Sequence, residues 1–158
     1  IDSAIAECDK QKGSVANVIK AGLLKYKDVE ANPGLDAEKS ALAIQKEIEE
    51  TTALEMPMLE KNLNVLATLV SIGTLTGLLG TVTGMIKAFS ALATGGAPDS
   101  AKLANGISEA LINTATGIAC STFAIVFYNI LTAKIDKLTY SIDEAGFSIV
   151  QTYAANHK

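Results

Sequence analysis

Two long stretches without a charged side chain constrain the fold more than any other feature of this sequence. No ionisable residue lies in the 25 positions from Asn62 to Ile86. In the 24 positions from Ala110 to Ala133, only Cys120 and Tyr128 can ionise, both weakly. A helix needs about 20 residues to cross the hydrocarbon core of a membrane. A soluble amphipathic helix of that length would carry a charged face. Both stretches are therefore predicted to be transmembrane helices.

The alternative is a hairpin buried inside a soluble helical bundle. That reading is weaker because a chain of 158 residues has too little other apolar sequence to surround two such helices. Composition agrees with the membrane interpretation, since charged residues make up 19% of the chain, against about 25% in a typical soluble domain.

Small and hydroxylated residues mark one side of each predicted span. Gly73, Gly77, Gly80 and Gly84 are spaced four, three and four residues apart, so they form one stripe on a helix. Two of these intervals match the Gly-xxx-Gly pattern that lets helix backbones approach closely in membranes. Thr and Ser side chains occur on both spans. Such a face either packs against other helices or lines a polar path, and the residues alone leave both interpretations open.

Lysine counts predict the topology. Residues 1–61 hold eight Lys, the segment from Lys87 to Glu109 holds two, and the tail from Lys134 holds three. Positive charge near the spans favours the cytoplasm. We therefore expect a cytoplasmic helical region at 1–61, a transmembrane helix at 62–93, a short periplasmic loop at 94–106, a second transmembrane helix at 107–133, and a cytoplasmic helical tail at 134–158.

The predicted helices extend beyond the membrane. Residues 1–31 are expected to be helical with a break at Gly13, and a turn is expected at 32–34. One long helix is predicted from Asp36, as its N-cap, to Ala93, bent or relaxed by Pro57. A second is predicted from about Asn105 to Tyr153, after a loop at 94–104. The apolar positions expected to pack outside the membrane are Val15, Ile19, Leu23, Leu42, Ile48, Leu59, Ile135, Leu138, Ile142, Phe147 and Ile149.

Composition also excludes several classes of function. The net charge is −4 and Arg is absent, which argues against nucleic-acid binding. One His and two Cys nearly exclude a metal site built from those ligands. There is no phosphate-binding loop, nucleophile elbow or zinc-protease motif, so neither an enzyme nor a cofactor is predicted.

Several motifs together resemble a known family. The stretch 77–89, GLLGTVTGMIKAF, and the stretch 103–111, LANGISEAL, followed by Thr114, Gly117 and Tyr128-Asn129, are similar to the ExbB/TolQ/MotA proton-channel family. The segments 12–15 and 21–23 also fit ExbB, which fits better than MotA. The resemblance covers nearly the whole chain in the family's order.

The resemblance implies an all-α integral membrane protein of the bacterial inner membrane. Such subunits assemble as a ring, with a pentamer expected, around a pore that holds transmembrane helices of an ExbD-like partner. Proton flow through the pair drives motion that a TonB-like protein passes to outer-membrane transporters. The resemblance also implies an upstream transmembrane helix. Because the chain begins at Ile1 without a Met, we expect that helix to have been removed or not included.

Motif matching also implies roles for individual residues. Thr81 and Thr114 correspond to pore-facing threonines, and Glu109 to the acidic residue at the start of the last span. Thr74 stands where the family usually has Pro and adds a hydroxyl one heptad before Thr81. The spans offer no carboxylate, His or Lys of their own, so the resemblance places the titrating Asp on the partner helix. The residues expected to pack helices closely are Gly73, Gly77, Gly80, Gly84 and Gly117.

Alternatives remain at this stage. A TolQ-like subunit, the motor of a gliding or secretion machine, or a structural membrane scaffold would look similar in sequence. Glu109 also has two readings: it either caps the N-terminus of its helix, where negative charge is favoured, or borders the ion path.

Overall fold

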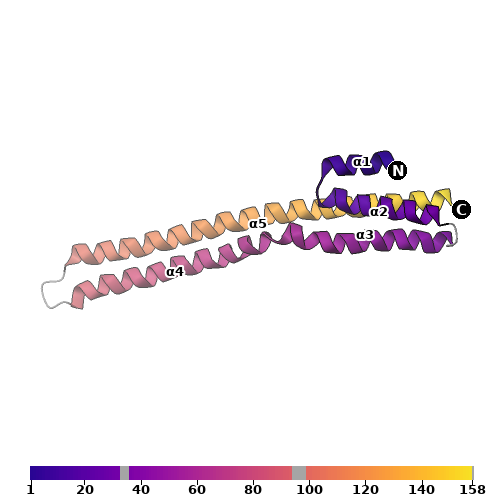
Figure 1. The fold of residues 1–158 in the computed structure, drawn as a ribbon. Helices are drawn as coiled ribbons and strands as arrows, with labels where there is room; N and C mark the ends of the chain where they lie inside the picture. Colours follow the sequence, from indigo (N-terminus) through magenta and orange to yellow (C-terminus); the bar gives the residue numbers. More distant parts are fainter. Residues whose placement is uncertain (33–35, 94–98, 158) are drawn as a thin grey trace. The chain divides into compact units, whose positions relative to one another are not determined.

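The computed structural model describes residues 1–32, 36–93 and 99–157. This part of the chain contains α-helices and no strand (Figure 1), which confirms the all-α prediction. The helices are α1 (Asp2–Gln11), α2 (Ser14–Ala31), α3 (Ala37–Glu60), α4 (Leu63–Ala93) and α5 (Ser100–Asn156). They belong to two compact units, one made of residues 1–61 and 132–158 and the other of residues 62–131. The predicted turn at 33–34 and the first part of the predicted loop, 94–98, lie outside the described residues.

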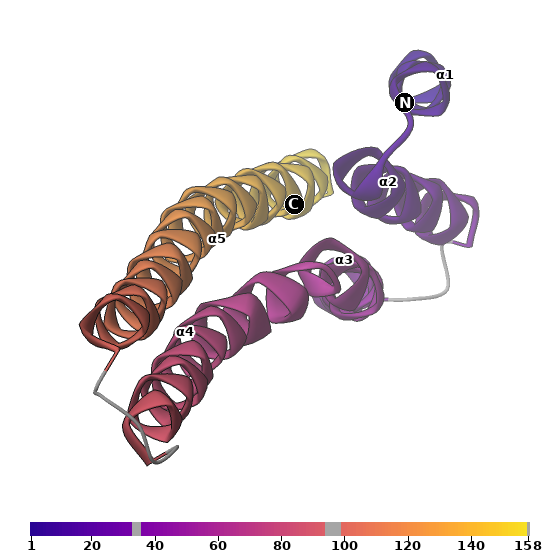
Figure 2. The same ribbon diagram turned by 90° about the vertical axis from the view of Figure 1, so that its left-hand side faces the viewer.

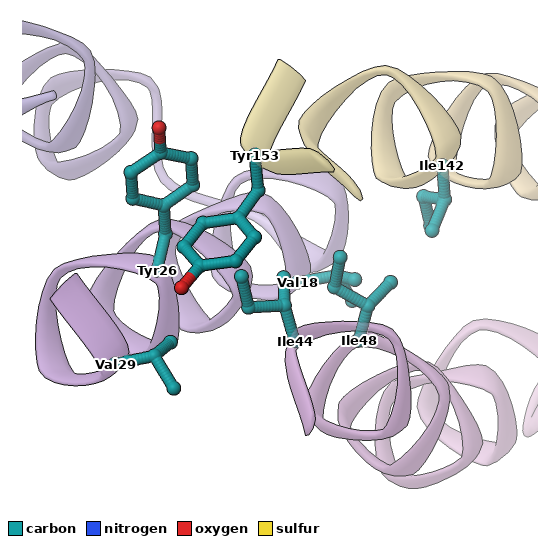
Figure 3. Packing of buried hydrophobic residues seen from close by; sticks show 7 residues of the cluster. All are labelled: Val18, Tyr26, Val29, Ile44, Ile48, Ile142 and Tyr153. Carbon is teal, nitrogen blue, oxygen red and sulfur yellow. The ribbon is translucent and has the colours of Figure 1, made fainter. Parts of the chain in front are cut away.

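The first unit packs α2, α3 and the C-terminal part of α5 around a small apolar core (Figure 3). The predicted break at Gly13 is confirmed: its φ of 130° lies in a region that favours glycine, and it separates α1 from α2. Tyr26 and Tyr153 meet edge to face, with ring centroids 5.0 Å apart. The buried cluster consists of Val18, Tyr26, Val29, Ile44, Ile48, Ile142 and Tyr153.

The core matches the predicted apolar positions only in part. Ile48 and Ile142 are buried as expected. Leu42 and Phe147 were expected to pack but are 65% and 64% exposed. Ile44, not Leu42, lies one turn before Ile48 on the buried face of α3.

The second unit is an antiparallel hairpin of α4 and residues 100–131 of α5, which lie side by side in both views (Figures 1 and 2). The contacts between the two helices confirm that they run antiparallel. Val70, early in α4, contacts Ser121, and Lys87, late in α4, contacts Glu109, which comes earlier in α5 than Ser121. The predicted loop is too long, because α5 begins at Ser100 and residues 100–106 are therefore helical.

The predicted long helix from Asp36 to Ala93, bent or relaxed by Pro57, is interrupted near its centre and forms two helices. Helix α3 ends at Glu60 and α4 begins at Leu63. Pro57 lies inside α3, one turn before the interruption. Proline has no N–H for the helical ladder, and its ring clashes with the carbonyl one turn earlier, which weakens a helix at this point.

The apolar side chains of the hairpin point outward. In the most apolar windows of the two candidate spans, only 6% and 17% of the residues are buried within the chain. A core helix of a soluble protein would be mostly buried. Large exposed apolar surfaces are covered by lipid or by other protein chains. Examples on this hairpin are Leu75, Leu78, Val82, Ile86, Leu111, Ile118, Phe123 and Phe127.

Candidate functional site

Helices α4 and α5 touch backbone to backbone along a row of small residues. A Cβ atom built on Gly117 would lie 2.6 Å from the Cα of Gly77, and one built on Gly77 would lie 3.1 Å from the Cα of Gly117. Ordinary contact to a Cβ begins at 3.4 Å. A side chain at Gly117 therefore forces the helices apart, and one at Gly77 requires its backbone neighbours to move by a few tenths of an ångström. This is the close approach that Gly-xxx-Gly patterns permit.

The other three glycines of the stripe lie in the same contact. A Cβ on Gly73 would meet the Oγ of Ser121 at 2.6 Å, and one on Gly80 would meet the Cβ of Asn113 at 2.5 Å. A Cβ on Gly84 would lie 2.8 Å from the Cβ of Ala110. We call this contact the seam, defined by Gly73, Gly77, Gly80 and Gly84 on α4 and by Gly117 on α5.

Hydroxyl groups meet along one side of the seam, which we call the hydroxyl side and define by Thr74, Thr81, Thr114 and Ser121. The hydroxyls of Thr81 and Thr114 share a hydrogen bond between the helices. Both also lie within reach of the carbonyl of Gly77, at 3.2 and 3.4 Å. One hydroxyl can thus donate to the other while the second donates to the carbonyl.

Thr74 and Ser121 form a second hydroxyl pair, with their oxygens 2.9 Å apart. Ser121 also donates to the carbonyl of Val70 at 2.7 Å. Ser121 was not among the predicted site residues, although it shares a helix face with Thr114 and Gly117 at 100° per residue. These side chains order polar contacts and water but do not titrate near neutral pH.

Glu109 does not join the hydroxyl side. Its Oε1 accepts a hydrogen bond from the Nζ of Lys87 at 2.9 Å, and both side chains are about half exposed or more. The helix-capping reading of Glu109 is wrong, because α5 begins at Ser100 and Glu109 therefore lies beyond its first turn. The sequence shows both charges, but their pairing depends on the register between the helices.

Asp99, not Glu109, caps α5. Its Oδ1 accepts the backbone N–H of Lys102 at 3.1 Å, and its carbonyl accepts that of Leu103. The hydrogen bond from the Lys102 backbone, helped by the Lys102 ammonium, holds the pKa of the Asp99 carboxyl below its ordinary value of 3.8. This cap explains why the helix starts earlier than predicted.

No metal site is found in the described part of the chain, where no three His, Cys, Asp or Glu side chains gather. The two cysteines are both free thiols. The chemistry of the described hairpin is therefore that of hydroxyls and amides between apolar helices, with ion pairs Lys87–Glu109 and Lys102–Asp99 near its loop end.

Comparison with protein families gives this arrangement a context. Residues 10–144 match the model of the MotA/TolQ/ExbB proton channel family. The chain belongs to this family. The match includes the seam, the hydroxyl side and Glu109. This is a family of membrane transport components and not of enzymes.

Individual relatives carry both the TolQ and the ExbB names. The Tol-Pal system protein TolQ of Pseudomonas aeruginosa is 32% identical over 78% of this chain and 54% of its own length. The biopolymer transport protein ExbB of Pseudomonas putida is 26% identical over 92% of this chain and 44% of its own length. The ExbB protein of Salmonella typhimurium is 33% identical over 54% of this chain and 35% of its own length. The chain thus spans about half or less of these relatives.

Proposed function

We propose that this chain is the pore-lining part of a proton-channel subunit in an inner-membrane energy-transducing motor. The observation that carries the proposal is the hydroxyl side. Hydroxyls from both helices meet inside sequence that has no carboxylate, His or Lys. A proton relay through a membrane normally needs an ionisable side chain. We infer that the titrating group comes from another chain.

The proposed partner is an ExbD-like subunit whose transmembrane helix brings an Asp to the hydroxyl side. Thr81 and Thr114 would contact that carboxylate directly or through water, and Thr74 would extend the polar path by about two turns. Several copies of the chain, with a pentamer expected, would surround the partner helices. The outward apolar surface of the hairpin supports such an assembly, since it needs both lipid and other chains to cover it.

The proposed topology places residues 1–61 and 134–158 in the cytoplasm and the segment between the spans in the periplasm. The larger number of lysines before the first span supports it. The apolar, outward-facing helices α4 and α5 support a two-span crossing within this chain.

The motor's cargo system is a separate part of the proposal. We favour an ExbB-like role that powers TonB-dependent outer-membrane transport, because the ExbB relative from Pseudomonas putida aligns over 92% of the chain. A TolQ-like role is the second candidate, and the 32% identity to TolQ supports it. Copurification from native membranes, with mass-spectrometric identification of the attached subunits, distinguishes them.

Proton flux in reconstituted vesicles tests the channel proposal. We expect little flux from this subunit alone, clear flux with its partner, and a marked loss in Thr114→Val, which keeps the shape but removes the hydroxyl. Thr122→Val is the matched control, because the Thr122 hydroxyl is exposed and donates only to the Ile118 carbonyl of its own helix. Strong flux from the subunit alone, or full flux in Thr114→Val with its partner, would contradict the proposal.

Glu109→Gln tests whether the carboxylate borders the ion path. The variant keeps the side-chain shape and removes the charge. Its pair with Lys87 is exposed and contributes little stability, so assembly should persist. We expect reduced flux with assembly intact. Unchanged flux would remove Glu109 from the path.

A further inference from the structure

The side of the seam away from the hydroxyl pairs is hollow. A groove of about 580 Å³ runs there between α4 and α5, with glycines of the seam in its floor. None of the four residues of the hydroxyl side lines it. We call it the Asn113 groove. The wall residues that matter below are Thr76, Thr83, Asn113, Thr116 and Cys120.

Asn113 brings unused hydrogen-bonding groups into this groove. Within the described chain its side-chain amide has no hydrogen-bond partner, whereas Thr83 and Thr116 donate to carbonyls of their own helices at 3.1 and 2.8 Å. In a membrane, water cannot replace the missing partners, and an unsatisfied polar group is costly. The groove therefore requires an occupant that offers hydrogen-bond acceptors to a side-chain amide.

A polar pocket of about 450 Å³ lies at the loop end of the hairpin, and we call it the Lys102 pocket. Lys87 pairs with Glu109 at 2.9 Å, and Lys102 reaches Asp99 at 3.4 Å. The pocket is also lined by Asn105. The charged side chains that line it are those of Lys87, Lys102 and Glu109, so it combines two ammonium groups with one carboxylate.

The pocket and the groove lie on the same side of the hairpin. Glu109 and Asn113 are four residues apart on α5, and Thr83 and Lys87 are four apart on α4, so each pair shares a helix face. Within each pair, the two residues lie about 6 Å apart along the helix axis. A charged pocket is thus followed by a free amide and then by a long, mostly apolar groove.

We propose that a zwitterionic glycerophospholipid with an ammonium headgroup, such as phosphatidylethanolamine, binds along this side of the hairpin. Its phosphate lies between the ammonium groups of Lys87 and Lys102, and its ammonium lies against the carboxylate of Glu109. An ester carbonyl accepts the Asn113 amide, and an acyl chain fills the groove over the glycines. Basic pockets between transmembrane helices are known binding places for lipid headgroups.

A lipid fits these groups better than a further transmembrane helix does. A helix uses its backbone carbonyls internally, so it would need one polar side chain in register with Asn113. A glycerophospholipid presents free ester carbonyls just below its headgroup, which is where Asn113 lies relative to the Lys102 pocket. The Glu109 carboxylate in that pocket favours a headgroup that carries an ammonium over a purely anionic one.

Lipid add-back to the full chain tests the proposal. The chain is purified in detergent, stripped of lipid and mixed with phosphatidylethanolamine or phosphatidylglycerol at equal mole ratio, and native mass spectrometry counts the bound lipids. We expect stronger retention of phosphatidylethanolamine. We expect a loss of about five- to tenfold in Asn113→Leu and in Lys102→Gln, the effect of removing one hydrogen bond or one charge contact. The matched control Thr122→Val should bind like the unmodified chain.

Cys120 gives an independent readout, because this residue lines the groove and is exposed. We expect added phosphatidylethanolamine to slow its modification by a small maleimide, while Cys8, on α1, reacts at an unchanged rate. Lys102→Gln alters only a side chain that is 73% exposed, so it keeps the test valid even if Asn113→Leu misfolds.

Three outcomes would overturn the proposal. The first is equal lipid retention by the unmodified chain, by Asn113→Leu and by Lys102→Gln. The second is retention of phosphatidylglycerol as strong as that of phosphatidylethanolamine. The third is cross-linking of Cys120 to another polypeptide in native membranes, which would identify the occupant as a protein helix.

Discussion

Gly117→Ala should open the hairpin, and its effect follows from the geometry of the seam. The added methyl group would lie 2.6 Å from the Cα of Gly77 and 2.7 Å from the carbonyl oxygen of Gly73. The first distance is about 0.8 Å short of ordinary contact, and the atoms that would have to move are backbone, so the helices must separate.

Separation has two costs. Overpacking a tight contact typically costs about 1–3 kcal/mol. Moving α4 from α5 also weakens the hydroxyl bonds between Thr81 and Thr114 and between Thr74 and Ser121, at about 0.6 kcal/mol each in a membrane. Since α5 stays helical when the hairpin opens, the higher helix propensity of Ala gives no compensation. We expect a total loss of about 2–4 kcal/mol.

The assay is unfolding of the purified chain in detergent by added SDS, followed by energy transfer between dyes at Leu75 and Ile118, which are both exposed. The matched control is Ala115→Val, which adds volume to an exposed position on the same helix. An SDS midpoint for Gly117→Ala equal to that of the control would refute the backbone contact described for the seam.

The remaining predictions concern the core, the helix cap and assembly. Ile44→Ala should destabilise the unit of residues 1–61 and 132–158 by about 2–4 kcal/mol, because Ile44 is fully buried, while Leu42→Ala should change its thermal midpoint little. The lowered pKa of Asp99 implies that its cap stabilises α5 above pH 3.8 and is lost as the pH falls further, through the folded-state pKa. The protection of the Lys102 amide against hydrogen exchange, relative to its intrinsic exchange rate, should therefore fall there but not near pH 7. Gly80→Leu should weaken the assembled complex in native mass spectrometry, and normal assembly would show that the seam serves only the single chain.

The sequence predicts the helices well where a single physical requirement decides them. The absence of charge over two stretches of membrane length leaves few alternatives to long apolar helices. The Gly13 break follows from glycine's access to positive φ. Helix ends were harder, because they depend on local hydrogen bonds. Asp99 caps α5 several residues before the expected start, and only the order Asp99-Ser100 hinted at it.

The sequence predicts which residue types form the candidate site, but not which side chains pair with one another across the two helices. A hydroxyl-rich face on each helix can be recognised from spacing, yet the Thr81–Thr114 and Thr74–Ser121 pairs depend on the register between the helices. The same register pairs Glu109 with Lys87 and leaves Asn113 without a partner within the described chain. One sequence alone does not fix such a register, because a shift by one turn preserves every face.

The tightness of the seam also limits where ions could travel in the proposed channel. Where Gly77 meets Gly117, the backbones leave no width for a file of water molecules. Within the described hairpin, a single copy therefore encloses no conduit between α4 and α5. In the proposed channel, an aqueous wire would therefore run along the outside of the pair, with its opposite wall supplied by another part of the assembly. Such a path could be opened or closed by a rotation or displacement of the structure opposite the hairpin, while the glycine contact between α4 and α5 stays rigid.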